Sequence, residues 1–369
     1  MTQPPHSVCE SFPAARDVLE QAIQDRVFPG AAFGVFAQGQ VLTTEALGHF
    51  TYEAGAPPVR PETIFDLASV SKVVATTATA MLLWERGRLD LHRPVGETLP
   101  EFVEAEALGS RKRSVTPTML LAHSSGLPAY ERLYERCSTR AELLDACLRM
   151  PLEAAPESRA VYSDIGFIVL GQLLERLAEE PLDAFCRREI FAPLGMTSTQ
   201  YRPPPEIRSS IPPTGIDVGL RRGTVQGEVH DENCCRLGGI AGHAGLFSNV
   251  ADVLRFASCI LRGGAPVFQR EAVSLFTARQ SMPPHTSRAL GWDTPSAPSS
   301  SGQFFSSHSV GHLGYTGTSL WIDREKQIAV ALLTNRTYPD AHSESSSEGI
   351  RRVRPRFHDA LMQELNASK

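Results

Sequence analysis

The sequence has no long apolar segment, no extended basic run and no regular cysteine pattern, and each absence excludes a class of protein. No hydrophobic run approaches the roughly 20 residues that a transmembrane helix needs. Residues 1–13 have neither a basic nor an apolar region, so we expect no signal peptide. The net charge is −5 and the longest basic run is Arg111-Lys112-Arg113. We therefore expect neither a nucleic-acid nor a membrane partner.

Cysteines are few, and their number is odd. The chain has seven of them, irregularly spaced, with Cys234 and Cys235 adjacent. This usage favours reduced thiols in a cytoplasmic protein over a disulfide framework. His230, Asp231 and His243 fit no closed zinc-ligand spacing, so we expect no metal.

Length and composition are those of an ordinary globular protein. The chain has 369 residues, of which 42% are hydrophobic and 21% charged. It is long enough for two subdomains or for one large domain with an ample core.

Ser69 and Lys72 form a Ser-x-x-Lys motif at the start of a predicted helix. The segment 73–85 has no Gly or Pro, and Gly87 is a good helix terminator. Because positions three apart share a helix face, the Ser69 hydroxyl lies beside the Lys72 amine. A lysine whose pKa is depressed can take the proton of a serine nucleophile. The alternative interpretation is a surface serine with a lysine one turn on.

Other elements follow from periodicity and from capping residues. Apolar spacing predicts a helix over 12–27, and a strand pair over 31–37 and 40–47 with a tight turn at Gln38-Gly39. Thr116 followed by Pro117 predicts the N-terminus of a short helix. Further helices are predicted at 140–149, 165–179, 182–191 and 250–261.

Two segments carry a resemblance to a known family. Residues 64–72 resemble the nucleophile segment of the serine β-lactamase and penicillin-binding protein superfamily, and 120–127 (LLAHSSGL) resemble a signature of the branch with class C β-lactamases, DD-peptidases and family VIII esterases. The resemblance implies an α/β (α+β) fold, a central antiparallel sheet flanked by helices. It also implies an inserted all-helical subdomain. We expect a single domain over 1–369, with an α/β subdomain at about 1–87 and 264–369 and a helical one at about 88–263.

Tyr162-Ser163-Asp164 matches the position of the family's Tyr-x-Asn motif. The resemblance implies that Tyr162 points its phenol at Ser69 and shares a proton with Lys72, so that the pair acts as base and acid. Asp164 departs from the usual Asn, and a carboxylate beside Lys72 would keep the lysine protonated. The alternative makes Tyr162 a core residue and Asp164 the cap of the next helix. His123 is expected to be structural and buried.

His312-Leu313-Gly314 matches the family's Lys-Thr-Gly or His-Thr-Gly strand, and a hairpin is predicted around 311–333. The resemblance implies that Gly314 lets substrate backbone lie close to the strand. The N–H of Tyr315 would be an oxyanion donor beside the N–H of Ser69. The Thr hydroxyl and Lys charge that hold a substrate carboxylate are missing, which favours a neutral ester as substrate.

The sequence is thus identified as a serine hydrolase that needs no cofactor. Ser69, Lys72 and Tyr162 are the expected catalytic residues, and Tyr315, His312, Gly314 and Asp164 the expected oxyanion and substrate-binding residues. The favoured substrate is a carboxylic ester. The Gly- and His-rich stretch 227–248 resembles members that act on cell-wall muropeptides, including N-acetylmuramyl-L-alanine amidases. A muropeptide amidase, DD-peptidase or β-lactamase is therefore an alternative, and a non-catalytic protein that binds peptidoglycan fragments is a second one.

Overall fold

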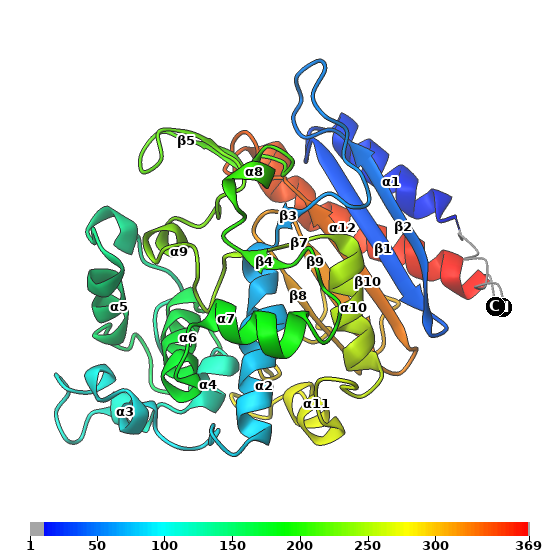
Figure 1. Ribbon diagram of the computed structural model, residues 1–369. Coiled ribbons are helices and arrows are strands. Elements are labelled where there is room, and N and C mark those ends of the chain that lie inside the picture. Colours follow the sequence, from blue (N-terminus) through cyan, green and yellow to red (C-terminus); the bar gives the residue numbers. More distant parts are fainter. Residues whose placement is uncertain (1–10, 368–369) are drawn as a thin grey trace.

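A five-stranded antiparallel sheet forms the centre of the fold. The computed structural model describes residues 11–367 (Figure 1). The strand order is β2-β1-β10-β9-β8. The strands are β1 (Gly30–Ala37), β2 (Gln40–Gly48), β8 (Ser309–Leu313), β9 (Ser319–Asp323) and β10 (Ile328–Thr334). Both predicted hairpins are confirmed, the first closing at Gln38-Gly39 and the other joining β9 to β10.

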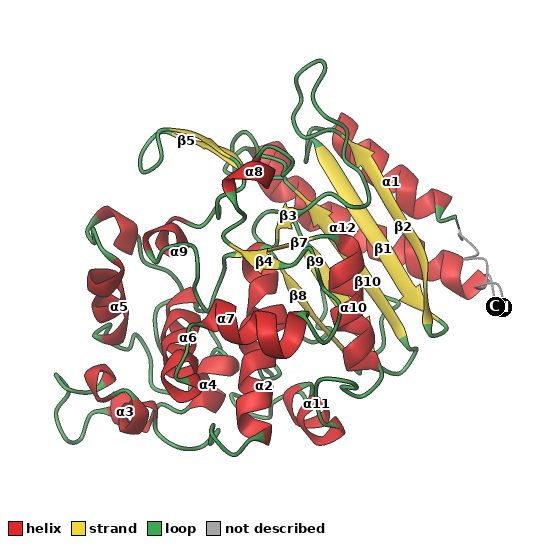
Figure 2. Ribbon diagram, in the orientation of Figure 1, coloured by secondary structure: helices red, strands yellow, loops and turns green. Residues whose placement is uncertain are grey.

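Helices cover both faces of this sheet (Figure 2). On one face, the large residues Ile328, Val330 and Leu332 of β10 pack with α1 (Pro13–Gln24) and α12 (Glu344–Ala367). The opposite face of β10 has Ala329 and Ala331, and α10 (Val250–Leu261) packs there. Small residues let this helix approach closely, since a Cβ at Gly34 of β1 would lie 2.4 Å from Val250 Cγ1. The sheet is therefore buried on both sides.

The helix that carries Ser69 is almost wholly buried beside the sheet. It starts as a 3₁₀ turn, η1 (Ala68–Val70), continues as a π-helix, η2 (Lys72–Thr77), and ends as α2 (Ala78–Glu85). The predicted extent is confirmed, and Gly87 adopts φ 66° directly after it. The wide π turn was not predicted. Such turns are frequent at functional sites because they displace side chains from regular helical positions.

The segment 88–263 is mainly helical. Its helices are α3 (Val95–Thr98), η3 (Pro100–Phe102), η4 (Arg111–Ser114), α4 (Pro117–Leu121), η5 (Leu133–Glu135), α5 (Arg140–Leu148), α6 (Asp164–Ala178), α7 (Leu182–Cys186), η6 (Arg187–Phe191), α8 (Pro205–Arg208), α9 (Glu232–Arg236) and α10. The Thr116 hydroxyl accepts a hydrogen bond from Met119 N, which confirms the predicted cap.

Four short strands correct the expectation of a purely helical segment. They are β4 (Gln200–Tyr201), β5 (Gly215–Asp217), β6 (Gly223–Val225) and β7 (Leu246–Ser248). Strand β7 pairs with β4 on one side and with β3 (Phe65–Asp66) on the other, and β3 directly precedes the turn that carries Ser69. Strands β5 and β6 pair with each other in a separate sheet. Strands of two or three residues are too short to show an alternating pattern in the sequence.

The proposed subdomain boundary near residue 263 stays a prediction. Helix α10 contacts β1, β9 and β10, which favours grouping it with the sheet, and α11 (Arg270–Phe276) then leads back to β8. None of the helices within residues 11–367 has the length and apolar character needed to cross a membrane. Six of the cysteines lie in this range, and all six are free thiols. Cys9 lies outside the described residues, and the cytoplasmic location stays a prediction.

Gly242 fixes the approach of the loop 241–244 to α6. A Cβ on Gly242 would lie 2.1 Å from Phe167 O and 2.9 Å from Gly171 Cα. The carbonyl of Gly242 also accepts a hydrogen bond of 2.7 Å from the Thr76 hydroxyl of η2. The loop is therefore held between two helices, with no room for a side chain at its centre.

We predict that Gly242→Ala destabilises the protein by about 1–3 kcal/mol, because the added methyl group overpacks a closed helix–loop contact. Urea unfolding of the variant and the parent measures the change. Gly109→Ala is the control, since a Cβ there meets nothing within 4 Å. Equal stability of the Gly242→Ala variant and the parent would contradict this account of the packing.

Candidate active site

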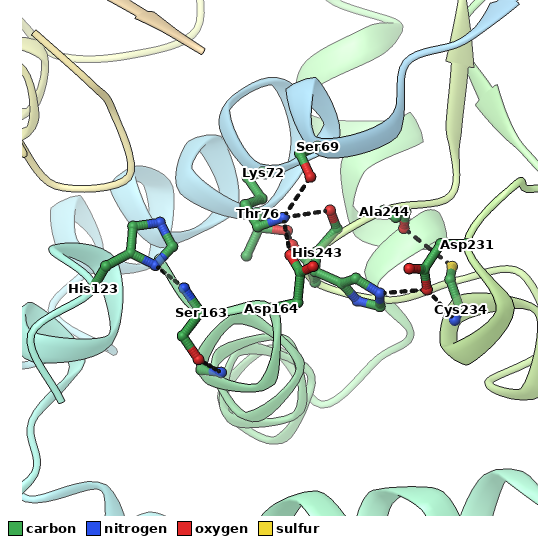
Figure 3. Close-up of polar contacts among 12 residues, drawn as sticks. Ser69, Lys72, Thr76, His123, Ser163, Asp164, Asp231, Cys234, His243 and Ala244 are labelled. Atoms are coloured by element: carbon green, nitrogen blue, oxygen red, sulfur yellow. Dashed lines mark hydrogen bonds and ion pairs between the residues drawn. The ribbon is translucent and has the colours of Figure 1, made fainter. Parts of the chain in front are cut away.

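Lys72 is the centre of the candidate site. Its side chain is fully buried, and its ammonium donates to Ser69 Oγ at 2.8 Å, Asp164 Oδ1 at 2.7 Å and the His243 carbonyl at 2.9 Å (Figure 3). The contact with Ser69 is the one predicted from the Ser-x-x-Lys spacing. The three acceptors belong to three segments that are far apart in the sequence, so the long-range fold completes this site.

Asp164 sets the protonation of Lys72. Burial alone would lower the pKa of Lys72, but the charge of Asp164 and the contact with Tyr162 outweigh it and raise the pKa above its ordinary value. The sequence allowed a lysine with a depressed pKa as the base, and the structure does not favour that form. Lys72 is a cation at neutral pH.

Tyr162 lies against the same cation. Lys72 Nζ is 5.0 Å from the centre of the Tyr162 ring. Burial raises the pKa of Tyr162, and the charge of Lys72 together with hydrogen bonding to Lys72 and Ser69 lowers it by less, so the phenol is neutral at neutral pH. Both members of the pair are thus protonated in the resting protein, and a base forms only when the pair loses a proton.

Ser163 caps helix α6, which corrects the alternative that gave this position to Asp164. The Ser163 hydroxyl accepts a hydrogen bond of 2.9 Å from Gly166 N. Asp164 is instead the first helical residue and directs its carboxylate at Lys72. Sequence could not separate the two, because both residue types are good caps.

His123 holds the strand-like segment that carries Tyr162. Its Nδ1 accepts a hydrogen bond of 3.0 Å from Ser163 N, and its carbonyl accepts one of 2.9 Å from Val161 N. The imidazole packs between the rings of Tyr162 and Phe167, with centroids at 4.6 and 4.9 Å. Burial lowers the pKa of His123 well below its usual value, so the ring is neutral. These contacts agree with the structural role expected for His123.

The turn before Ser69 is strained and firmly anchored. Ala68 adopts φ 47°, a left-handed conformation that is unfavourable for a residue with a side chain. The buried carboxylate of Asp66 accepts hydrogen bonds from Ala68 N at 2.8 Å and His230 N at 2.7 Å. Burial raises the pKa of Asp66 to about 6 despite these donors. These hydrogen bonds to Asp66 fix the backbone of the turn and so keep the Ser69 side chain directed at Lys72.

The residues after β8 press against that turn. The hydroxyls of Thr316 and Thr318 donate to the carbonyls of Asp66 and Leu67, at 2.8 and 2.9 Å. A Cβ on Gly314 would lie 2.0 Å from Thr318 Oγ1 and 2.5 Å from Leu67 O. Contact with the protein's own backbone is thus a sufficient reason for glycine at this position, and the approach of substrate backbone to Gly314 stays a prediction.

His312 and Tyr315 flank Gly314 and differ in exposure. His312 is buried, and its ring centre lies 5.9 Å from that of Tyr162. Burial holds the pKa of His312 well below its usual value. Tyr315 is 47% exposed, and the guanidinium of Arg336 lies 4.5 Å from its ring centre. The role of the Tyr315 N–H as an oxyanion donor stays a prediction.

The sequence predictions did not include His243 among the site residues. Its backbone carbonyl binds Lys72, and its imidazole Nε2 donates to Asp231 Oδ1 at 2.7 Å. Burial would raise the pKa of Asp231, but the imidazole outweighs it and lowers the value to about 2. Asp231 also caps α9 by accepting from Cys234 N at 2.6 Å. The Gly- and His-rich composition of 227–248 was the only sequence signal for this contact.

Comparisons with known proteins agree with this geometry. The beta-lactamase family model matches residues 15–353. The chain is 32% identical to the N-acetylmuramyl-L-alanine amidase of Bacillus subtilis (strain 168) over 345 residues, which cover 84% of this chain and 78% of the relative. It is 29% identical to a putative D-alanyl-D-alanine carboxypeptidase of Escherichia coli (strain K12), with 84% of this chain and 79% of the relative covered.

A solved structure has the same fold. It is EstCE1, described as a hydrolase with promiscuous acyltransferase activity, with a TM-score of 0.75 and 23% identity. The match covers 95% of this chain and 98% of that chain. The predicted fold class is thereby confirmed.

We predict that Asp164→Asn shifts the reactivity of Ser69 to lower pH. The Asp164 charge raises the pKa of both Lys72 and Tyr162, so its removal lowers both values and frees a base earlier. In the parent, phosphonylation of Ser69 by a fluorophosphonate should become faster with rising pH up to at least pH ~9. In the variant the same rise should lie about one to three pH units lower.

Asp145→Asn is the control for the loss of one carboxylate, because Asp145 is an exposed partner of Arg149. Its pH profile should overlay that of the parent. A profile of Asp164→Asn that is unmoved, or moved to higher pH, would show that Asp164 does not hold the proton on the pair.

Proposed function

The chain belongs to the beta-lactamase family of serine hydrolases, and on that premise we propose that it cleaves acyl bonds through an acyl-enzyme on Ser69. The observation that carries the proposal is the hydrogen bond of 2.8 Å between Lys72 Nζ and Ser69 Oγ, completed by Asp164 at 2.7 Å. The Lys72 ammonium fixes the Ser69 hydroxyl and can stabilise a phenolate at Tyr162, which is the base that activation of the serine needs.

Lys72 and Tyr162 move the protons as one unit in this proposal. Ser69 Oγ attacks the substrate carbonyl while its proton passes to Tyr162, whose phenolate forms when the pair has lost a proton and is stabilised by the Lys72 ammonium. The same proton then goes to the leaving group. A water repeats the sequence and releases the acyl group, so the serine is regenerated and no cofactor is needed.

The N–H groups of Ser69 and Tyr315 are the proposed oxyanion donors. Their placement is supported by the bonds from Thr316 and Thr318 to the segment before Ser69, which hold the two backbone stretches together. A fixed donor of this kind stabilises the transition state by about 3 kcal/mol. Asp164 positions Lys72, while Gly314 permits the close contact between the stretches and His312 lines the same strand.

We favour an amide bond in a cell-wall fragment as the substrate. The loop that contains His243 supplies an acceptor to Lys72, so the stretch 227–248 is part of the site. That stretch resembles members that act on muropeptides, and a relative that is 32% identical is named an N-acetylmuramyl-L-alanine amidase. The sequence alone favoured an ester over a muropeptide amide. Because this loop contacts Lys72, we now rank the amide first.

A carboxylic ester is the second candidate substrate. Leu313 stands where the family pattern has a threonine, and His312 is neutral where other members have a lysine. The strand therefore lacks the hydroxyl and the charge that would otherwise hold a carboxylate beside Gly314.

Ser69→Ala should leave a folded protein whose hydrolysis of any acyl substrate is at background, because no acyl-enzyme can form. Intact-mass measurement after mixing with a slowly hydrolysed ester should show a covalent adduct on the parent alone. Circular dichroism of both proteins checks the fold. Appreciable turnover by the variant would rule out Ser69 as the nucleophile.

A substrate panel separates the two candidate substrates. N-acetylmuramyl-L-alanyl peptides, short p-nitrophenyl esters and nitrocefin are compared by kcat/KM, with Ser69→Ala as the blank for each. For each substrate, kcat/KM is divided by the rate of its uncatalysed hydrolysis. We expect this ratio to be at least about tenfold higher for the muropeptide amide than for the ester, a difference of about 1.4 kcal/mol in transition-state binding. Ester cleavage without any amide cleavage would favour the second candidate.

A further inference from the structure

Arg288 presents its guanidinium to the Tyr162 ring of the candidate site. None of the roles assigned above involves this arginine. Its Cζ lies 5.5 Å from the centre of the Tyr162 ring, and Tyr162 also packs on Lys72 and His312. We propose that Arg288 binds a carboxylate of the substrate, so that the enzyme selects acyl substrates that are anionic. This inference rests on the proposed function, since it concerns what the Ser69 site accepts.

The turn that carries Arg288 is fixed to the site. Asp293 and Gly311 of β8 exchange two backbone hydrogen bonds of 2.9 Å, which attach the turn 288–293 to the strand that bears His312. Gly291 N donates to Leu121 O at 3.0 Å, and a Cβ on Gly291 would lie 1.9 Å from Thr77 Oγ1 of the nucleophile helix. A guanidinium on such a turn is preorganised, which reduces the entropy lost on binding.

Arg288 is only partly neutralised by the protein. Its side chain is 21% exposed, and the Asp293 carboxylate lies 3.7 Å from its Nη1, beyond hydrogen-bonding distance. The same carboxylate oxygen already accepts from Ser287 Oγ at 2.7 Å and from Thr294 N at 3.1 Å. The donors of Arg288 therefore remain able to meet an incoming anion. Lys72, in contrast, is saturated by its three acceptors.

The imidazoles near Tyr162 cannot supply this positive charge. His312 Nδ1 donates to the carbonyl of Leu313 at 2.8 Å, and burial keeps the ring neutral by lowering the pKa of His312. Burial does the same for His123, and the charge of Arg288 lowers both pKa values further. Arg288 thus takes over the electrostatic role that a lysine in place of His312 would have.

The geometry also indicates the chemistry of the ligand. A guanidinium offers a planar pair of donors that matches a carboxylate with two parallel hydrogen bonds. A carboxamide of the same shape can accept one of these bonds but has no charge. If Arg288 binds a substrate carboxylate, the enzyme should therefore prefer a substrate with a carboxylate over the same substrate with a carboxamide in its place.

The test uses two pairs of esters that differ only in this group. The first pair is the mono-p-nitrophenyl ester of pimelic acid and its terminal carboxamide, which places the charge on the acyl side. The second is a phenylacetyl ester of 3-hydroxybenzoic acid and of 3-hydroxybenzamide, which places it on the leaving group. We expect the parent to prefer the carboxylate in one pair by about ten- to a hundredfold in kcat/KM.

Arg288→Gln should reduce that preference to about twofold or less, whereas Arg288→Lys should retain part of it, because a lysine keeps the charge but loses the fork. Arg270→Gln is the matched control, since Arg270 is an exposed arginine at the start of α11 and its loss changes the net charge equally. This control should keep the full preference. Melting temperatures of all variants check that each is folded.

The outcomes separate this inference from the proposed function. If a fluorophosphonate does not label Ser69 in the parent and neither pair is cleaved, the proposed function fails and this inference fails with it. If Ser69 is labelled but the parent shows no preference in either pair, or Arg288→Gln keeps the preference, only the assignment of Arg288 is overturned.

Discussion

The buried ammonium of Lys72 is the constraint on which the rest of the site depends. An unpaired charge inside a protein costs several kcal/mol, so the fold must supply partners for it. It does so with three acceptors, from the nucleophile turn, the first residue of α6 and the loop before β7. Each of these segments is held in turn by its own contacts, and the correct assembly of the site is therefore part of the stability of the fold.

The sheet positions the nucleophile turn from the other side. The turn between β8 and β9 binds the backbone of 66–67 through two threonine hydroxyls. Arg354 of α12 donates to the carbonyls of Gly314 and Thr318 at 2.6 and 2.8 Å and so ties that turn to the C-terminal helix. Burial lowers the pKa of Arg354 to about 9, which reflects how little solvent reaches this support. The β8–β9 turn and α12, both near the C-terminal end of the chain, thus help to fix the position of the turn that carries Ser69.

The features that could be predicted from the sequence are those that depend on residues close together in the chain. The N-terminal helix and hairpin, the cap at Thr116 and the pairing of Ser69 with Lys72 all follow from spacing over a few residues. The contact of His243 with Lys72 joins residues 171 positions apart, and the approach of Arg288 to Tyr162 depends on a turn whose place is set by β8. No local pattern specifies such distances. The contact of Gly314 with Leu67 was not predicted for the same reason, because Leu67 lies far away in the chain.

The position of β1 in the sheet also determines when the protein can fold during synthesis. Strand β1 pairs with β2 at once, but its other edge waits for β10, with Ala31 opposite Thr334. The partner that caps the start of α1 is more distant still, because Ala14 N donates to Glu364, 350 positions later. A lone hairpin is marginally stable, so an apolar strand stays exposed while the ribosome completes the chain. The five-stranded sheet can therefore be completed only after β10 has been synthesised, and α1 gains its contact with Glu364 only when nearly the whole chain has been made.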